Sequence, residues 1–277
     1  MILADTMDIG YPSLALGYAL LIIPLGLMLW HRIPIVGRTL IAVARMTVQL
    51  LFVGLYLQFV FRLNSPWLNA AWLVVMLVVA DFSIVRGCGL RLGRFLAPVL
   101  AGLFVGTIVP LLFFLGLILR QPNLLEAQYA IPIAGMILGN CLRADIVGLR
   151  SFYESIRKSE KAYLHSLAQG ARLNEAVRPF YRDAVTAALA PTVATIATIG
   201  LVALPGMMTG VILGGADPMT AIKYQIAIMI AILAGTAITV ALGIWLTTRQ
   251  TFTAYGTLDH SIFKKAKPRG ARGTRGR

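Results

Sequence analysis

Long apolar stretches constrain the fold of this chain more than any other feature of its sequence. A helix that crosses a bilayer needs roughly 20 consecutive, mostly apolar residues. Seven stretches of this kind lie at Tyr11–Trp30, Thr39–Phe61, Trp67–Val85, Phe95–Leu119, Tyr129–Val147, Ala184–Leu204 and Tyr224–Thr248. They predict an all-α integral membrane protein with seven transmembrane helices.

The Lys and Arg residues are distributed unevenly between the loops, and this predicts the orientation. If the N-terminus lies outside, 22 of the 25 Lys and Arg residues fall in inner loops, at inner helix ends or in the tail, and only Arg62, Arg120 and Lys223 lie outside. Short cytoplasmic loops of membrane proteins are enriched in Lys and Arg. The sequence therefore predicts that the N-terminus is outside and the C-terminus inside.

Composition and motifs exclude several other classes of protein. Charged residues make up 13% of the chain, against roughly 25% in soluble domains. The net charge of +14 follows from topology and anionic lipid, so nucleic acid is not an expected partner. The chain has no phosphate-binding loop of the Walker type, so we expect no bound ATP or other cofactor and a partner for any ATP-driven role. It also lacks the motifs of a membrane enzyme.

We expect one transmembrane domain over residues 1–250 and a basic, disordered cytoplasmic tail over 251–277. Residues 148–183 form the only long connection, and its apolar residues recur at helical spacing: Phe152, Ile156, Tyr163 and Leu167. Gly170-Ala171 breaks this helix, and Asn174 can cap a second one. The connection therefore reads as a helical hairpin that lies on the membrane surface or docks on a partner protein as a lever.

Ionisable side chains are rare inside the stretches. Asp81, Arg143 and Asp145 lie near inner ends, where a salt bridge or snorkelling to the interface explains them. Asn140 can line a pathway or hydrogen-bond to a neighbouring helix. Three pairs of glycines at helix-packing spacing predict close helix contacts: Gly102 with Gly106, Gly135 with Gly139, and Gly210 with Gly214.

The apolar segment of residues 205–216 is too short to cross the membrane, so we expect a re-entrant or interfacial segment. Asp217 and Pro218 then form the N-cap and first position of the last span. Met207 and Met208 either fill packing gaps or contact a soft cargo.

Several strings of residues together carry a resemblance to a known family. They are Ile131-Pro132-Ile133-Ala134-Gly135-Met136, Gly139-Asn140, Gly170-Ala171, Arg182-Asp183-Ala184, Leu204-Pro205-Gly206-Met207-Met208, Asp217-Pro218 and Lys223-Tyr224-Gln225. Over essentially its full length, the chain resembles the FetB-like permeases of ABC transporters, a family tied to bacterial iron export and, in plants, to aluminium tolerance.

The resemblance implies a permease subunit of the bacterial inner (cell) membrane. Such a subunit pairs with itself and with two copies of a cytoplasmic ATPase, which binds the ATP, and it exports iron or another metal ion. The coupling residues implied are Leu167, Gly170, Ala171 and Asn174, and the residues expected along the translocation pathway are Met136, Asn140, Met207, Met208 and Gln225. The alternatives are an ATP-independent transporter and a structural membrane protein.

The sequence departs from the family at places that bear on the cargo. Arg172-Leu173 stands where relatives have Thr-Pro, and Arg143 and Asp145 add charge where relatives tend to be neutral. No acidic or Cys/His cluster forms a metal cage, so metal-binding residues stay unassigned. A bare ion would have to use carbonyls, Asn140 or water, and a chelated or organic cargo is equally compatible.

Overall fold

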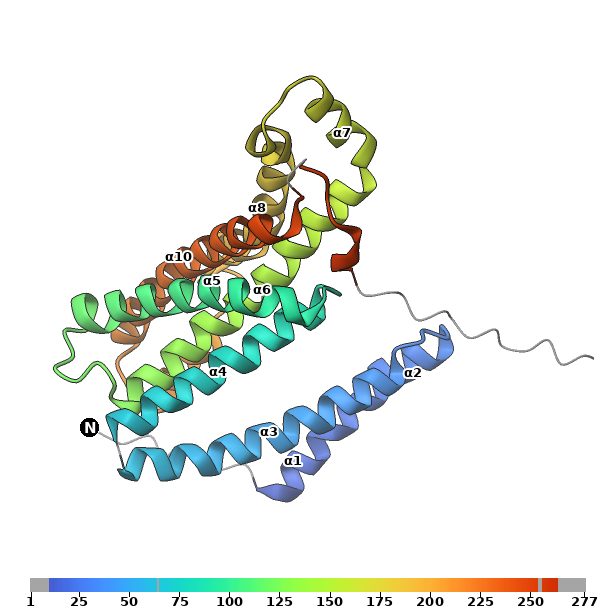
Figure 1. Cartoon of the computed structure of the whole chain (residues 1–277). Coiled ribbons are helices and arrows are strands. Elements are labelled where there is room, and N and C mark those ends of the chain that lie inside the picture. Colours follow the sequence, from blue (N-terminus) through green and yellow to red (C-terminus); the bar gives the residue numbers. More distant parts are fainter. Residues whose placement is uncertain (1–9, 64, 254–255, 264–277) are drawn as a thin grey trace, which may run out of the picture.

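The computed structural model describes residues 10–63, 65–253 and 256–263, and every regular element there is a helix (Figure 1). The expected all-α class is thereby confirmed for these residues. The elements are α1 (Tyr11–Tyr18), η1 (Ala19–Leu21), α2 (Ile22–Trp30), α3 (Val36–Leu63), α4 (Pro66–Gly87), α5 (Leu92–Phe113), η2 (Phe114–Ile118), α6 (Ala127–Lys158), α7 (Glu160–Ala168), α8 (Leu173–Thr198), α9 (Gly206–Leu213), α10 (Pro218–Thr251) and η3 (His260–Ile262).

Within the described residues, six helical segments are long and apolar enough to cross a membrane. They are Pro12–Trp30, Val36–Leu63, Pro66–Gly87, Leu92–Ile118, Ala127–Lys158 and Pro218–Thr251. The stretch expected as a further span, Ala184–Leu204, falls in α8, which ends at Thr198 and is not among them. The first half of α8 carries Arg178, Arg182 and Asp183, and its second half is rich in Thr and Ala. The seven-span count and the orientation stay predictions.

Helices α4, α5, α6 and α10 form the packed core of the molecule (Figure 1). α5 and α10 approach most closely at glycines. A Cβ atom on Gly102 would lie 3.0 Å from the backbone N of Gly243, and one on Gly106 would lie 2.9 Å from the carbonyl O of Gly235. The first expected glycine pair therefore makes a close helix contact. A Cβ on Gly139 or Gly210 would meet nothing within 4 Å, whereas one on Gly135 would lie 3.4 Å from the Cε of Met76 on α4, so each of the other two pairs has at least one glycine without a close helix contact.

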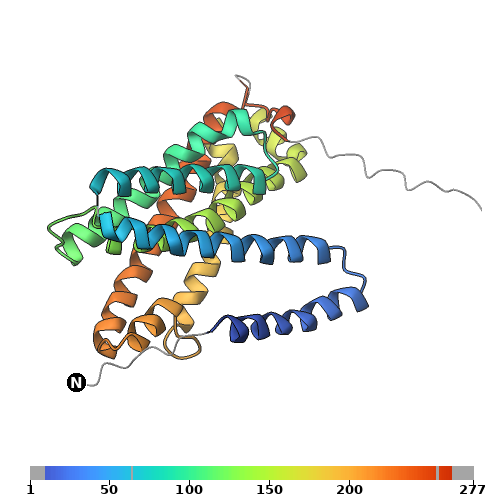
Figure 2. The same cartoon turned by 90° about the horizontal axis from the view of Figure 1, so that it is seen from below.

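Helices α1, α2 and α3 lie beside this core rather than in it (Figure 2). Val60 is the buried residue of α3, and it packs with Ala127 and Ile131 of α6. Nearby, the rings of Tyr56 and Trp72 stack at 4.0 Å. These contacts with the core gather near the C-terminal end of α3, whereas Thr39 and Thr47, nearer its start, contact Met28 of α2 and Tyr18 of α1.

The last span begins as the sequence predicts. The side chain of Asp217 accepts a hydrogen bond of 3.0 Å from the backbone N of Thr220, and Pro218 occupies the first helical position. The preceding segment contains α9, a helix of 8 residues that is too short to span a bilayer. Whether residues 205–216 re-enter the membrane stays a prediction.

Residues 252–263 were expected in the disordered tail, but the described ones, 252–253 and 256–263, fold back onto the helices. We call these residues the C-terminal strap. Leu258 and Ile262 are buried, and the backbone N of Arg91 donates a hydrogen bond of 2.9 Å to the carbonyl O of Ile262. The folded unit thus extends past residue 250, because these apolar residues can be buried against the loop between α4 and α5. Residues 264–277 lie outside the described residues.

Candidate functional site

The long connection is a helical hairpin that projects from the core, as Figure 1 shows. α6 has 32 residues and is therefore about 48 Å long, which exceeds the roughly 30 Å thickness of a hydrocarbon core. It passes through Ser159 into α7, and the chain returns in α8. The two long helices α6 and α8 therefore join the membrane part to the hairpin without a flexible loop.

Gly170 has a structural reason to be glycine at the hairpin tip. Its φ is +92°, in the left-handed region that favours glycine. The N–H of Gly170 donates to the carbonyl O of Leu167 at 2.9 Å, and the N–H of Ala171 donates to the carbonyl O of Ser166 at 3.2 Å. These two bonds are the Schellman arrangement that ends a helix. The glycine therefore sets the angle at which the chain turns from α7 into α8.

A cavity of about 500 Å³ lies at this tip. It is lined by Ser166, Gln169, Gly170, Ala171, Glu175, Ala176 and Pro179. Leu167 does not line it, because its side chain faces the strap, where a Cβ on Gly256 would lie 3.3 Å away. Of the four predicted coupling residues, Gly170 and Ala171 therefore meet at the tip.

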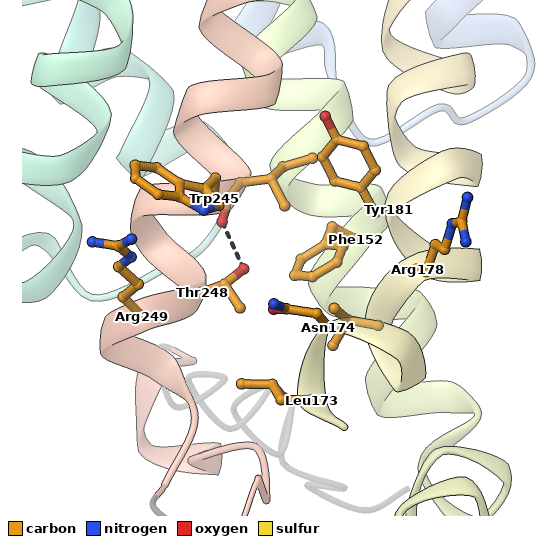
Figure 3. A pocket seen from close by; sticks show the side chains of 10 residues that line it. Phe152, Leu173, Asn174, Arg178, Tyr181, Trp245, Thr248 and Arg249 are labelled. Atoms are coloured by element: carbon orange, nitrogen blue, oxygen red, sulfur yellow. Dashed lines mark hydrogen bonds between the residues drawn. The ribbon is translucent and has the colours of Figure 1, made fainter. Parts of the chain in front are cut away.

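Asn174 is not the cap of the second helix. The backbone N of Arg172 instead donates to the side chain of Glu175 at 2.8 Å, and α8 starts at Leu173. Asn174 lines a second cavity of about 290 Å³ between α6, α8 and α10 (Figure 3). Two arginines of this cavity, Arg178 and Arg249, lie on opposite sides of it in the figure, and Arg249 stacks on Trp245 with its guanidinium carbon 3.9 Å from the ring centroid.

The strap connects the hairpin to the α4–α5 loop. Tyr163 of α7 donates a hydrogen bond to the carbonyl O of Gly256, and the guanidinium of Arg157 lies 5.0 Å from the ring centroid of Phe263. Burial raises the pKa of Tyr163 to about 12. At the other end, hydrogen bonds from Arg94 and Ser261 lower the pKa of Asp259 to about 2.

Asn140 lies in a third cavity of about 420 Å³, between α6 and α8. Its amide nitrogen donates to the carbonyl O of Met136 at 2.8 Å, so this bond stays within α6. Arg143 lies beside it and donates to its amide oxygen at 3.1 Å. Asn140 makes neither of these bonds to a neighbouring helix, and its role in a pathway stays a prediction.

Among the described residues, neither Arg143 nor Asp145 forms the salt bridge that was one of the two explanations from the sequence. Two residues apart on a helix, these side chains point to different sides. Asp145 is 1% exposed and accepts a hydrogen bond of 2.7 Å from the hydroxyl of Thr239 on α10. Neither Asp145 nor the buried Asp81 forms an ion pair within the described part of the chain. This contact could not be predicted from the sequence, since Thr239 lies on another helix.

The remaining pathway residues do not meet in one place. Met208 and Gln225 line an apolar cavity of about 520 Å³ between α8, α9 and α10. Gln225 is 8% exposed, and its side-chain oxygen has no partner among the described residues. Met136 and Met207 are half-buried and pack against the core.

These features define a class of protein: an all-helical, multi-pass membrane protein with a projecting helical hairpin and cavities beside its long helices. Within that class, the model of the uncharacterised protein family UPF0014 matches residues 11–252, and the chain belongs to this family.

Relatives from bacteria and plants resemble the chain over most of its length. A UPF0014 membrane protein of Synechocystis is 33% identical over 83% of this chain and 86% of its own. The "Probable iron export permease protein FetB" of Escherichia coli is 28% identical over 94% of this chain and 99% of its own. The "Protein ALUMINUM SENSITIVE 3" of Arabidopsis thaliana is 31% identical over 70% and 69%. No solved structure matches the chain.

Proposed function

We propose that this chain is the permease subunit of an ABC transporter of the bacterial inner membrane. It works as a homodimer with a separate cytoplasmic ATPase and exports iron or another metal. The chain itself is not an enzyme, because the partner hydrolyses the ATP.

The observation that carries this proposal is the hairpin that extends α6 and α8 beyond the membrane part. A push on its tip is transmitted along two stiff helices rather than lost in a loop. α6 lines the cavity of Asn140 together with α8. A tilt of the hairpin would therefore change the space between these two helices, which is what alternating access requires.

The name of one relative supports the cargo and the role as a permease. The E. coli relative carries the name "Probable iron export permease protein FetB", and its match covers 94% of this chain. Among the described residues, no group of three or more His, Cys, Asp or Glu side chains is placed to hold a metal ion. The amides of Asn140 and Gln225, each in its own cavity, are the polar groups we assign to the pathway.

The first test is whether an ATPase accompanies the chain. We expect the permease, purified in mild detergent from its native membrane, to bring with it a protein that hydrolyses ATP and carries a phosphate-binding loop. Iron added to the complex should stimulate hydrolysis. A permease that exports iron with no ATPase bound would contradict the proposal and favour an ATP-independent transporter.

The second test addresses coupling through Gly170. Gly170→Val puts a β-branched residue at φ +92°, which costs of order 1–3 kcal/mol and distorts the turn. We expect this variant to insert into the membrane but to lose most iron-stimulated ATP hydrolysis and export. Gly170→Asn is the matched control, because Asn tolerates the left-handed region. Normal transport by Gly170→Val, or equal loss in both variants, would contradict coupling by the tip geometry.

A further inference from the structure

Arg143 lies in the membrane part of α6, deeper in the bundle than its basic end. The turn between α4 and α5 marks that end, where Arg86, Arg91 and Arg94 gather. The thiol of Cys88, in this turn, lies 3.7 Å from the carbonyl O of Ile146. Since Ile146 is level with the turn, Arg143 is about one helical turn further into the membrane.

The side chain of Arg143 points deeper still. Its Nε donates to the carbonyl O of Gly139 at 3.2 Å, and its Nη2 donates to the side-chain oxygen of Asn140 at 3.1 Å. Both acceptors precede Arg143 in α6. The guanidinium therefore points toward the N-terminal end of α6, away from the basic end of the bundle. This is the opposite of snorkelling, in which a long cationic side chain reaches the nearest interface.

The guanidinium has no counter-ion in the described structure. Its cavity is lined by Asn140, Arg143, Ala144, Ile146, Val147, Ala188, Pro191, Thr192 and Thr195, and none of these is acidic. Asp145 points to the opposite side of α6, toward Thr239 of α10. An uncompensated cation in the membrane is costly, and such residues commonly mark substrate or ion pathways.

We propose that the cavity between α6 and α8 binds an anionic, oxygen-rich cargo, namely a metal chelated by a small carboxylate ligand. Arg143 supplies charge and paired N–H donors for a carboxylate, and the amide of Asn140 holds the guanidinium in place. A hydrogen bond from Thr195 to the carbonyl O of Pro191, at 2.9 Å, fixes one hydroxyl on the facing wall.

Size and charge both favour a chelate over a bare ion. The cavity volume of about 420 Å³ lies within the range of about 300–1,000 Å³ typical of small-molecule sites. A bare divalent cation would need only a small part of this space. It would also be repelled by the guanidinium, since like charges disfavour each other strongly where water is scarce.

The test uses the purified permease without its ATPase and measures binding by calorimetry. We expect ferric citrate to bind to the wild-type chain. Arg143→Gln should weaken binding by about tenfold to a hundredfold, the usual value of a hydrogen bond to a charged group. Arg143→Lys should keep part of the affinity, because it keeps the charge but not the planar donor pair.

Arg182→Gln is the matched control. Arg182 is also an exposed arginine, on α8, and it does not line the cavity. We expect wild-type affinity from this variant, which removes the same charge. Equal ferric citrate binding by wild type and Arg143→Gln would overturn the proposal, and so would tighter binding of ferrous ion in citrate-free buffer.

Three further ligands separate the sources of anionic oxygen: citrate alone, inorganic phosphate, and vesicles of phosphatidylglycerol. Weaker binding of each than of ferric citrate supports a metal chelate as cargo. An Arg143-dependent preference for phosphatidylglycerol would overturn it and assign the cavity to a lipid headgroup, and a preference for phosphate would assign it to that anion.

This inference rests on the proposed function only in treating the bound anion as the transported substrate. The anion site and the ABC transporter can therefore be disproved separately. Loss of ferric citrate binding in Arg143→Gln, with no ATPase partner found, would leave the anion site standing and remove the ABC transporter. Unchanged ferric citrate binding in Arg143→Gln, with iron-stimulated ATP hydrolysis in the complex, would remove the anion site and support the ABC transporter.

Discussion

Gly106 lies where α5 and α10 cross with too little room for any side chain. A Cβ atom there would lie 2.7 Å from the Cβ of Thr239 and 2.9 Å from its backbone N. Both atoms belong to a helix that is packed on its other side, so they cannot move aside freely. The same closeness lets Thr239 reach Asp145 on α6 with its hydroxyl. The absence of a side chain at Gly106 therefore allows α5 to pack closely against α10 at Thr239, the residue that bonds to Asp145 of α6.

We expect Gly106→Val to destabilise the membrane domain by about 1–3 kcal/mol, the typical cost of overpacking a core. Gly139→Ala is its control, because a Cβ at that position meets nothing within 4 Å. Melting of the purified protein in detergent checks both. An equal loss of thermal stability in the two variants would show that the crossing is looser than described.

At the scale of elements, the strap is the segment that ties the hairpin to the α4–α5 loop. Tyr163 and Leu167 of α7 contact it on one side, and Leu90, Arg91 and Arg94 contact it on the other. α5 is also the helix that α10 crosses at its glycines. The strap therefore contacts both the hairpin and the start of α5.

The strap should loosen in acid because of Asp259. The pKa of its carboxyl is lowered to about 2 from its ordinary value of 3.8, so the ionised form favours the docked strap. This contribution is present above pH 3.8 and is lost as the pH falls through 2. We expect faster hydrogen exchange of the Arg91 amide, which donates to Ile262, at pH 2 than the intrinsic pH dependence predicts.

The effect should be small, because an exposed ion pair contributes little. Asp259→Asn should show the faster exchange already at pH 5, with less dependence on pH. Glu154→Gln removes another exposed carboxylate, the partner of Arg150, and should leave the strap unchanged. If hydrogen exchange of the Arg91 amide is as slow in Asp259→Asn as in the wild type, the ion pair between Arg94 and Asp259 does not stabilise the docked strap.

At the scale of the whole molecule, the asymmetry of Lys and Arg predicts which end of the bundle faces the cytoplasm. A cysteine at Lys161, on the hairpin, should react with a membrane-impermeant thiol reagent only from the cytoplasmic side. A cysteine at Pro122, in the connection between α5 and α6, should react only from outside. The wild-type chain gives the background, since Cys141 is buried and Cys88 half-buried. Labelling at Lys161 from outside would reverse the topology and remove the basis for an ATPase partner.

The helical architecture could be predicted from the sequence because it depends on local features. Apolar length marks α3 to α6, Asp217-Pro218 marks the start of α10, and Gly170 marks the hairpin tip. Apolar length does not mark α8 as a span in the same way, since α8 mixes charged with small residues.

Features that depend on contacts between distant residues could not be predicted. The strap docks through Ile262, whose partner Arg91 lies far back in the chain. Arg143 and Asp145 look like a pair in the sequence, yet the helix turns them toward different neighbours. Of the predicted pathway residues, Asn140, Met208 and Gln225 line cavities, and the two cavities are separate. Which of them conducts cargo is a property of the assembled transporter rather than of one helix.

The position of Phe263, paired with Leu90 and facing Arg157, has a practical side for experiments on living cells. A fluorescent protein or an affinity tag joined directly after Phe263 would begin close to the junction of α6 and α7. There it competes for room with whatever docks on the hairpin. Poor activity of such a fusion reports crowding, and removing the appended domain with a site-specific protease should restore the activity.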